Sequence, residues 1–544
     1  MRTDTDVDVV VIGAGHNGLV CAGYLARAGH RVKVVERRSV VGGAAVTEEF
    51  HPGFRNSVCS YVVSLLHPKV IADLDLHGHG LEILDRPGGS LSPRADGRCL
   101  SLPRDDARAM AEIASFSNRD AGRYQAFHGI LERTAQALRS IVLETPPNLG
   151  GGWRDLWQAL ATGNRLRRLD AADQGALAGL MTKSVGDYLD EWFEFDGLKG
   201  VYGFEGIVGN MVSPYAPGTA YVLLHHYFGE VNGRVGAWGH ARGGMGAITQ
   251  AMARSAAAYG VEIEVEAPVA EVLLEGRGAG RREGARAVGV ALEDGRTIRA
   301  RAVAANVTPK VLFLKLVDEA ALAPDFLRAL RAWRCRSGTF RMNVALSELP
   351  AFTGLPAGDP AELMSGTIDV CPSLAYLERA YDDAKAGAWA REPIVSMCIP
   401  STLDDTLAPP GGHVASLFCQ HFHPELSGGR TWDDVKDEVA DLIIATVDRY
   451  APNFKRAVVG RQVLSPLDLE RDFGLTGGDI FHGALHLDQI YSLRPAAGHA
   501  DYRAPIAGLY MCGAGTHPGG GVTGAPGHNA AREITRDFRR RRVG

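Results

Sequence analysis

Cysteine is scarce and scattered in this chain. Its 544 residues include eight cysteines, and no two of them stand at the CxxC spacing of a redox disulfide or a zinc site. No hydrophobic run has the length that crosses a bilayer, and no internal repeat is evident. The net charge of −5 gives no excess of basic residues. These features argue against a disulfide-stabilised secreted protein, a metal protein, a membrane-spanning protein and a nucleic-acid partner.

The start of the chain resembles no targeting segment. Residues 1–8 are acidic and short, unlike a signal peptide or a transit peptide. Together with the dispersed cysteines, this indicates a cytoplasmic protein. A hydrophobic content of 46% and a charged content of 22% are typical of a globular enzyme with at least two domains. Composition leaves a homo-oligomer open.

The first forty residues predict a dinucleotide-binding unit. A Val-rich strand at 7–12 leads into a GxGxxG at 13–18, and a helical pattern then runs to Gly29. A second strand at 31–35 ends at Glu36, whose carboxylate would accept hydrogen bonds from ribose and disfavours NADP. The alternative, a glycine turn that binds nothing, fits the acidic residue poorly. We expect the cofactor to contact Gly13, Gly15, His16, Asn17, Gly18 and Glu36.

A second glycine pair distinguishes FAD from NAD. Gly42-Gly43 follows the second strand, and Thr47 places a hydroxyl four residues beyond the pair. This resembles the second signature of the large FAD family that includes amine oxidases and phytoene desaturases. Glycines there would let the backbone approach a phosphate or the flavin, although an ordinary loop is the alternative. We assign Arg37, Gly42, Gly43 and Ala44 to the cofactor site.

The middle of the chain reads as mostly helical. Residues 105–143 predict helix, and Trp153, Leu156, Trp157 and Leu160 make one apolar helix face beside Arg165, Arg167 and Arg168. Core packing is the favoured interpretation of that face, and contact with a membrane surface is the alternative.

A helix at 219–228 carries Tyr221 and the pair His225-His226. Without a carboxylate or cysteine at ligand spacing, we expect these side chains to line a cavity and not to hold a metal. Strands at 269–274, 287–292 and 297–304 then predict a small antiparallel sheet, and Val269 is assigned to the cofactor site. The Gly/Arg segment 276–286 is interpreted as a hairpin tip, not an RNA-binding segment.

Further strands suggest a second sheet. They are expected at 340–346, 364–370, 394–399 and 413–420, followed by an amphipathic helix at 432–451. Few helices separate these strands, so we predict a mixed or antiparallel sheet that forms the floor of a substrate-binding domain.

The C-terminal segment 508–527 is rich in glycine. A second dinucleotide fold is excluded there because only 31 residues remain after Gly513. A strand at 509–512 and a helix at 529–540 instead complete the first domain, with backbone N–H groups facing the cofactor. The cofactor residues expected here are Gly513, Ala514, Gly521 and Val522.

The sequence from Leu509 to Ala525 resembles the C-terminal signature of bacterial phytoene desaturases. The segments 399–413, 478–482, 488–491 and 494–495 are more similar to the pyridine nucleotide-disulphide oxidoreductase domain-containing protein two family. This resemblance implies non-covalent FAD and an α/β fold, in which a Rossmann-like FAD-binding domain receives an inserted α+β substrate-binding domain.

The expected domains are discontinuous. Residues 1–80, 243–310 and 480–544 are predicted to form the FAD-binding domain, and 81–242 with 311–479 the substrate-binding domain. No redox disulfide motif accompanies the family name, and the mitochondrial address of animal relatives has no counterpart in residues 1–8.

The predicted reaction is removal of hydride from a C–H bond of a lipophilic, polyprenoid-like substrate. A flavin amine oxidase and an FAD-binding regulatory protein with little turnover are the alternatives. No nucleophile–base constellation is evident. His517 is expected nearest the flavin, either as a polar contact or as a support of the glycine loop. Weaker cavity candidates are Tyr221, His225 and Gln489.

Overall fold

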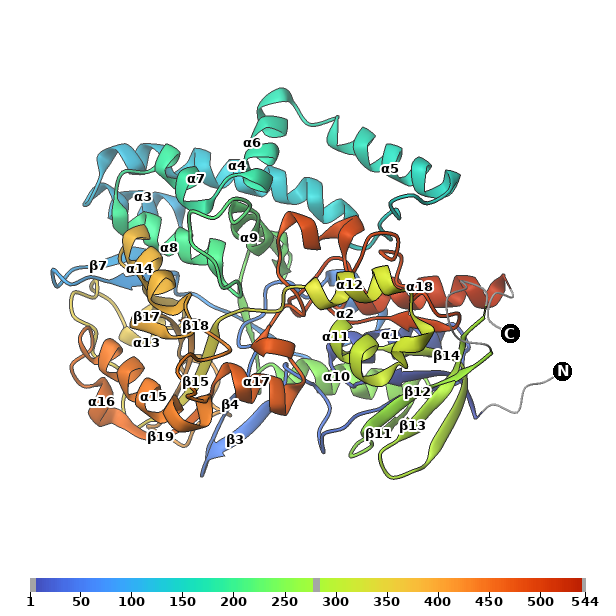
Figure 1. Ribbon diagram of the computed structural model, residues 1–544. Coiled ribbons are helices and arrows are strands. Elements are labelled where there is room, and N and C mark those ends of the chain that lie inside the picture. The colour runs from blue at the N-terminus through green and yellow to red at the C-terminus, as the bar shows by residue number, and fades with distance from the viewer. Residues whose placement is uncertain (1–5, 277–283, 541–544) are drawn as a thin grey trace.

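A computed structural model describes residues 6–276 and 284–540 (Figure 1). One sheet has the order β11-β2-β1-β14-β13-β12, and β20 pairs with β14. Its strands are β1 (Val7–Ile12), β2 (Val32–Val35), β11 (Glu262–Glu264), β12 (Val269–Glu275), β13 (Arg286–Leu292), β14 (Thr297–Ala305) and β20 (Leu509–Met511). The pairs among β11, β2, β1, β14 and β20 are parallel, while β12, β13 and β14 form an antiparallel meander. The predicted small sheet is therefore continuous with the parallel one through β14.

Helices cover both faces of this sheet. The valines of β1 are buried on both sides, as expected of a central parallel strand. On one face lie α1 (His16–Arg27), α10 (Gly246–Ala258) and α18 (Ala525–Arg539). On the other lie α11 (Pro309–Val311), the π-helical turn at 312–316 and α12 (Pro324–Ala332). The first and last helices can pack closely because Gly527 has no side chain. A Cβ at this position would overlap Asn17 O.

The last helix begins earlier than predicted. It starts at Ala525 and not at Asn529, with Pro526 in its first turn. Proline lacks an N–H group that this position leaves unbonded in any case. The Ala-Pro-Gly sequence suggested a loop, but it forms the first turn of α18.

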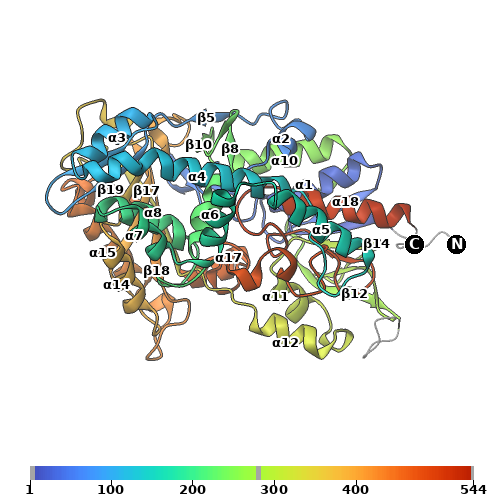
Figure 2. The same cartoon turned by 90° about the horizontal axis from the view of Figure 1, so that it is seen from above.

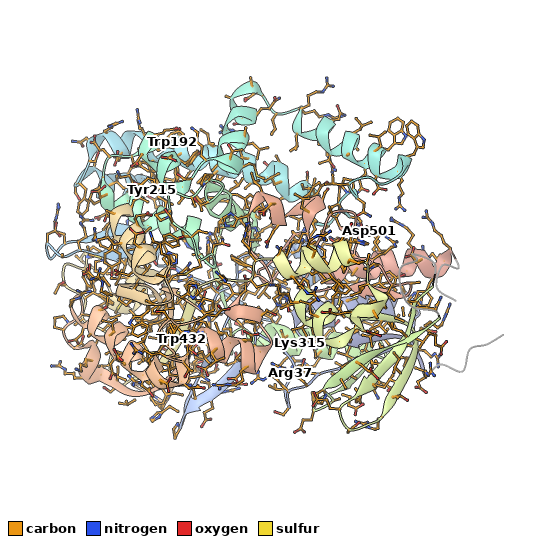
Figure 3. All side chains as sticks on the ribbon, in the orientation of Figure 1. Arg37, Trp192, Tyr215, Lys315, Trp432 and Asp501 are labelled. Carbon is orange, nitrogen blue, oxygen red and sulfur yellow. The ribbon has the colours of Figure 1, made fainter. Side chains whose placement is uncertain are left out.

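The second sheet has the order β19-β15-β18-β17-β16-β6-β7. Its strands are β6 (Ser90–Pro93), β7 (Cys99–Leu102), β15 (Thr339–Leu346), β16 (Thr367–Val370), β17 (Trp389–Cys398), β18 (His413–Phe422) and β19 (Val458–Leu464). The helix α15 (Trp432–Asp448) covers one face, and Trp432 is buried there (Figure 3). Only β6 and β16 pair in parallel, so the predicted mixed sheet is confirmed. The domain boundaries expected from the sequence stay predictions, and α12, from the segment 311–479 assigned to the substrate-binding domain, packs on the first sheet.

Helices from the middle of the chain lie over the second sheet and extend toward the FAD-binding domain (Figures 1 and 2). They are α3 (Asp106–Ala114), α4 (Asn118–Val142), α5 (Trp153–Leu166), α6 (Ala171–Thr182), α7 (Val185–Trp192), α8 (Asp196–Ile207), α9 (Ala220–His225) and α14 (Leu374–Ala384). The short helices are α2 (Pro68–Asp73), α13 (Pro360–Leu363), α16 (Phe454–Ala457) and α17 (Pro466–Phe473). Two hairpins are formed by β3 (Thr47–His51) with β4 (Phe54–Ser57) and by β8 (Glu230–Val231) with β9 (Arg234–Val235). A third short strand pair joins β5 (Ile83–Asp85) to β10 (Gly239–Ala241). The helical segment 105–143 is divided in two because the Ser117 side chain caps α4.

The apolar face of α5 departs from the expectation. The sequence favours core packing, but Trp153 is 76% exposed and Trp157 67% exposed. The spacing of apolar residues predicts a helix face and cannot say whether another element covers it. Within residues 6–276 and 284–540, no helix combines the length and the hydropathy needed to span a bilayer. Most of the hairpin tip expected at 276–286 lies outside the described residues.

Candidate functional site

The first glycine loop is shaped by backbone contacts. Gly13 has a φ of +92°, a conformation that favours glycine. A Cβ at Gly18 would overlap Gly13 O, and a Cβ at Gly15 would lie 2.9 Å from Asn306 Nδ2. The loop precedes the N-terminus of α1, where free N–H groups favour an anion. Its geometry therefore fits a pyrophosphate cradle that side chains would fill.

Glu36 lies where a ribose ligand is expected. It directly follows β2, is 6% exposed, and its Oε2 accepts a hydrogen bond of 2.8 Å from Ala14 N. Its Oε1 accepts one of 3.0 Å from Arg38 N. The carboxylate is thus held against the loop. Val269 begins β12 nearby, since Ala267 N donates to Glu36 O.

Asn306 is a site residue that sequence reasoning missed. Its Nδ2 donates to Gly13 O at 3.3 Å, and its atoms restrict the Cβ positions of Gly15, Gly18 and Gly513. The signal was available, because Asn306 is the first polar residue after the strand predicted at 297–304. Carboxyl ends of parallel strands meet at one sheet edge, which is where ligands bind in such folds.

The second glycine pair touches the first loop. Gly42 N donates to Ala14 O at 2.9 Å, and a Cβ at Gly43 would lie 3.3 Å from Gly15 Cα. Ala44 O accepts from Ser60 N. Arg37 is not brought into this cluster: it is exposed, and its Nη2 donates to Arg471 O (Figure 3).

The C-terminal glycine loop closes over α1. Nε2 of His16 lies 3.2 Å from Gly521 O, and burial lowers the pKa of His16 to about 4. Gly513 borders Asn306, and Val522 packs against the core beneath α1. The ring of His16 is thus neutral at pH 7 and serves the loop as a hydrogen-bond partner.

Arg494 supports the same loop and was also missed as a site residue. Its Nη2 donates to Ala514 O at 2.7 Å and to Phe481 O at 2.6 Å, and its Nη1 donates to Gln489 O at 2.9 Å. Burial lowers the pKa of Arg494 to about 10, so the guanidinium remains charged. In the sequence, Arg494 stands out only as part of a segment that is similar to the family. Its role could not be predicted because its contacts join segments that are distant in sequence.

The imidazole ring of His517 is engaged by the backbone of α4. Its Nε2 lies 3.0 Å from Ile141 O at the end of α4, and its ring centroid lies 5.2 Å from that of Tyr491. Burial lowers the pKa of His517 to about 4. Of the two roles left open by the sequence, this geometry matches support of the glycine loop.

Gln489 also serves the backbone. Its Oε1 accepts from Arg334 N at 2.9 Å, and its Nε2 donates to Arg334 O at 3.1 Å. Both ends of the amide are therefore engaged away from the glycine loops. The structure does not bring Gln489 to the substrate side as the sequence suggested.

His225 and Tyr221 lie beside the C-terminal loop. The His225 ring packs against Phe228 at 5.2 Å and Phe481 at 6.4 Å, and Phe481 contacts Gly520. Tyr221 belongs to the same apolar cluster. Burial lowers the pKa of His225 to about 4 and raises that of Tyr221 to about 12. Both residues thus form a neutral, aromatic wall.

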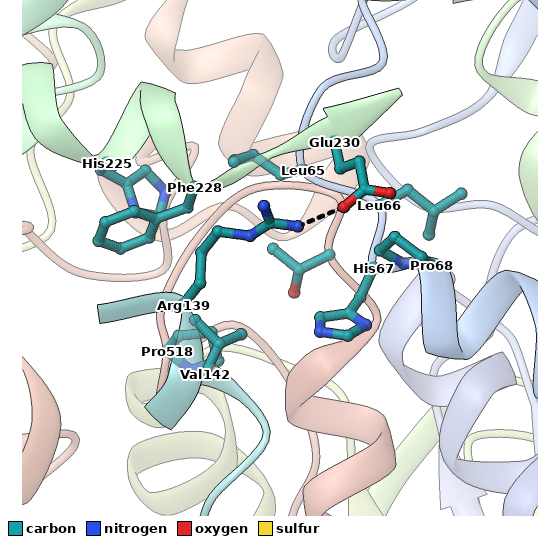
Figure 4. A pocket seen from close by; sticks show the side chains of 11 residues that line it. Leu65, Leu66, His67, Pro68, Arg139, Val142, His225, Phe228, Glu230 and Pro518 are labelled. Atoms are coloured by element: carbon teal, nitrogen blue, oxygen red, sulfur yellow. Dashed lines mark hydrogen bonds and ion pairs between the residues drawn. The ribbon is translucent and has the colours of Figure 1, made fainter. Parts of the chain in front are cut away.

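A pocket opens at this wall (Figure 4). Its lining includes apolar side chains and one ion pair, in which Arg139 Nη2 lies 2.8 Å from a Glu230 carboxylate oxygen. The residues that line it are Leu65, Leu66, His67, Pro68, Arg139, Val142, His225, Phe228, Glu230, Pro518 and Thr523. The lining is thus mainly apolar, with the Arg139–Glu230 ion pair as its charged part.

Comparison with known proteins identifies the arrangement. Residues 18–339 match the family model described as flavin containing amine oxidoreductase. The chain is 41% identical to pyridine nucleotide-disulfide oxidoreductase domain-containing protein 2 of Rattus norvegicus, over 98% of this chain and 94% of the relative. It is 26% identical to a limonene dehydrogenase component of Castellaniella defragrans, over 98% of this chain and 95% of the relative. Phytoene desaturases are more distant relatives at 26% identity.

A solved structure shows the same fold. Cyclohexylamine oxidase from Brevibacterium oxydans superposes with a TM-score of 0.56 and 18% identity, over 98% of this chain and all of that one. The resemblance, the fold class and the cofactor predicted from the sequence are confirmed. The cofactor is FAD, and the glycine loops fit it.

Proposed function

Because the chain belongs to the flavin-containing amine oxidoreductase family, we propose that this FAD-dependent oxidoreductase dehydrogenates a lipophilic, polyprenoid-like substrate at a C–H bond. When bound, FAD would accept the hydride from one C–H bond, and the substrate would lose a proton in the same dehydrogenation. The observation that carries the proposal is the aromatic wall of Tyr221, His225 and Phe228 beside the C-terminal glycine loop. Its groups are neutral at pH 7, as an apolar substrate requires.

The relatives support the same direction. One of them is named as a component of limonene dehydrogenase and another as phytoene desaturase, and both align over at least 95% of this chain. Likeness to cyclohexylamine oxidase concerns the fold alone at 18% identity. Dehydrogenation of an unsaturated hydrocarbon therefore has more support than oxidation of an amine.

Anaerobic flavin reduction tests the proposal. The FAD-loaded protein is mixed with lipophilic polyenes and, separately, with simple primary amines, and absorbance at the flavin bands is followed. Bleaching by a polyene and none by amines is expected. Rapid bleaching by an amine would favour the amine oxidase, and a stable flavin spectrum with every compound would favour the regulatory FAD-binding protein.

The exposed face of α5 supports substrate uptake from a membrane surface. Trp153 and Trp157 head this face, with three leucines around them that are each about half exposed. Those leucines are Leu149, Leu156 and Leu160. Among the described residues, Arg154, Arg167 and Arg168 have no carboxylate partner, whereas Arg165 pairs with Glu144. Apolar rings flanked by unpaired arginines complement an anionic bilayer.

Vesicle binding tests this contact. Wild type should co-sediment with vesicles that contain anionic lipid, and the double variant Trp153→Ser/Trp157→Ser should lose most of that binding. Tyr259→Ser removes an exposed aromatic from another surface and serves as the control. Equal binding by the double variant would remove the membrane role. A dimer in light scattering that the double variant abolishes would assign the face to a homo-oligomer.

A further inference from the structure

The face of the second sheet that lies opposite α15 carries a row of aligned residues. Arg341 on β15 pairs in register with Phe418 on β18, which pairs with Ser396 on β17, which pairs with Asp369 on β16. Their strand neighbours point to the other face and pack in the core beneath α15. The row is therefore a continuous strip across four strands.

This strip faces the flavin-binding segments. The Arg341 Cζ atom lies 4.6 Å from the centre of the Tyr61 ring. Two residues along β15, Asn343 Nδ2 donates to Ser57 O at 3.1 Å. Ser60 N in turn donates to Ala44 O in the second glycine loop. Arg341 thus lies on the substrate-domain side of the cofactor site.

The Arg341 guanidinium is buried without a counter-ion. The residue is 1% exposed, and its Nη2 donates to Ser416 Oγ at 2.6 Å. Its Nε and Nη1 are buried and have no hydrogen-bond partner among the residues that the structure describes. No carboxylate pairs with it among residues 6–276 and 284–540. Asp369, the carboxyl group of the row, is three strands away, about 14 Å at the usual spacing of strands.

Burying an unpaired charge is costly, so an arginine in this state indicates a missing anionic partner. Arg494 provides the internal comparison. It is equally buried, but carbonyl oxygens accept from its Nε, Nη1 and Nη2. The three nitrogens of Arg494 are therefore satisfied by the backbone, whereas Nε and Nη1 of Arg341 are not, within the part of the chain that the structure describes.

The surroundings of Arg341 are aromatic. Its Cζ lies 5.9 Å from the centre of the Phe418 ring, and Phe418 contacts Phe204 edge to face at 6.1 Å. Aromatic faces support a guanidinium and also accept apolar surface of a ligand. We infer that Arg341 binds a single anionic group, a carboxylate or a phosphate, at one end of the lipophilic substrate. This inference rests on the proposed function and names its substrate class.

Binding of amphiphiles to the oxidised, FAD-loaded protein tests the inference without turnover. Dodecanoate, dodecyl phosphate and dodecanol are titrated while the flavin absorbance spectrum and the heat of binding are followed. Wild type should bind at least one of the two anions more tightly than dodecanol. Arg341→Met should weaken that anion about 10- to 100-fold, the value of charge-assisted hydrogen bonds, and leave dodecanol unchanged.

Two further variants keep the test decisive. Arg341→Lys retains the charge and should recover part of the affinity. Arg461→Met removes a guanidinium from neighbouring β19 that already pairs with Asp437 and Asp441, and should leave anion binding unchanged. Thermal stability of Arg341→Met should equal or exceed that of wild type, because an uncompensated buried charge is removed.

Three results would overturn the inference. They are equal anion affinity in wild type and Arg341→Met, loss of FAD from Arg341→Met, and unfolding of both Arg341 variants. The first would assign the open nitrogens to water, the second to the cofactor and the third to the fold. Tight anion binding together with no flavin bleaching by any polyene would instead contradict the proposed function and leave Arg341 as an anion site.

Discussion

The glycine loops of the FAD-binding domain and the strip around Arg341 satisfy their polar groups in different ways. In the loops, Glu36 accepts from Ala14 N and Arg38 N, and the backbone of one loop bonds to the next. On the strip, two buried nitrogens of Arg341 have no partner within residues 6–276 and 284–540. The glycine loops are held in place by hydrogen bonds within the protein, whereas the positive charge of Arg341 is not balanced by a nearby carboxylate in the described part of the chain. This contrast underlies the proposal that the glycine loops and Glu36 bind FAD and that Arg341 binds the substrate.

The largest effect is expected from a substitution in the first glycine loop. Gly18→Ala places a Cβ into Gly13 O, which cannot move without disrupting the turn. We expect a protein purified without colour and an FAD affinity at least about 100-fold weaker, since more than one charge-assisted bond is displaced. Absorbance and FAD titration measure both.

Gly163→Ala is the matched control for this change. Gly163 lies inside α5, and a Cβ there meets no atom within 4 Å. The variant should retain FAD and gain about 0.5–1 kcal/mol of stability from reduced backbone freedom. An intact yellow Gly18→Ala protein would show that the loop tolerates a side chain and is not a tight cradle.

Glu36→Ala is expected to have an intermediate effect. It removes the carboxylate proposed to hold the ribose, and the net loss is expected to be that of about one charge-assisted hydrogen bond, about 1.5–3 kcal/mol. FAD affinity should fall by about 10- to 100-fold, and saturating FAD should restore the flavin spectrum. Unchanged affinity in a fluorescence titration would remove Glu36 from the ribose site. Glu132→Gln, on the exposed side of α4, controls for loss of a carboxylate.

The smallest effect is expected in the pH dependence of stability, from a buried carboxyl group in the substrate-binding region. Burial, and then the charge of Asp369, raises the pKa of Glu205 on α8 to about 8. Between about pH 4.5 and 8 the folded protein keeps this proton and the unfolded chain does not, so stability falls as pH rises. Glu205→Gln should therefore gain stability over wild type toward pH 8, on the order of 1–3 kcal/mol.

Urea unfolding at about pH 5 and pH 8 measures this difference. The gap between Glu205→Gln and wild type should be small at the lower pH and larger at the higher one. Parallel pH dependences for the two proteins would show that Glu205 titrates normally. Glu132→Gln, on the exposed side of α4, is measured beside them as the control for replacing a carboxyl group by an amide.

The first two glycine loops could be predicted from the sequence because their determinants are local. The GxGxxG, Glu36 and the Gly42-Gly43 pair stand within 31 residues, and strand–turn–helix geometry fixes their neighbourhood. The long-range parts could not. Asn306 meets Gly13 through parallel pairing of β1 with β14, and the alignment of Arg341 with Ser396 depends on the register of three strands. Arg341 stands in an apolar strand, but the sequence does not show what it faces.

Burial is the other quantity that the sequence leaves open. Trp153 and Trp157 have the spacing of a packed helix face, but no element in the described part of the chain covers them on α5. Gln489 has the chemistry of a substrate contact, but the backbone of Arg334 engages both ends of its amide. A pattern predicts which side chains share a face. Only the tertiary arrangement determines which partner that face meets.

One comparison of two variants tests most directly whether the two regions have separate tasks. Affinities for FAD and, at saturating FAD, for dodecanoate and dodecyl phosphate are measured side by side in Glu36→Ala and Arg341→Met. The account predicts that Glu36→Ala weakens FAD and leaves the anions unchanged, while Arg341→Met weakens the anion that wild type prefers and leaves FAD unchanged. Loss of both affinities in either variant, or loss of FAD alone in Arg341→Met, would contradict it.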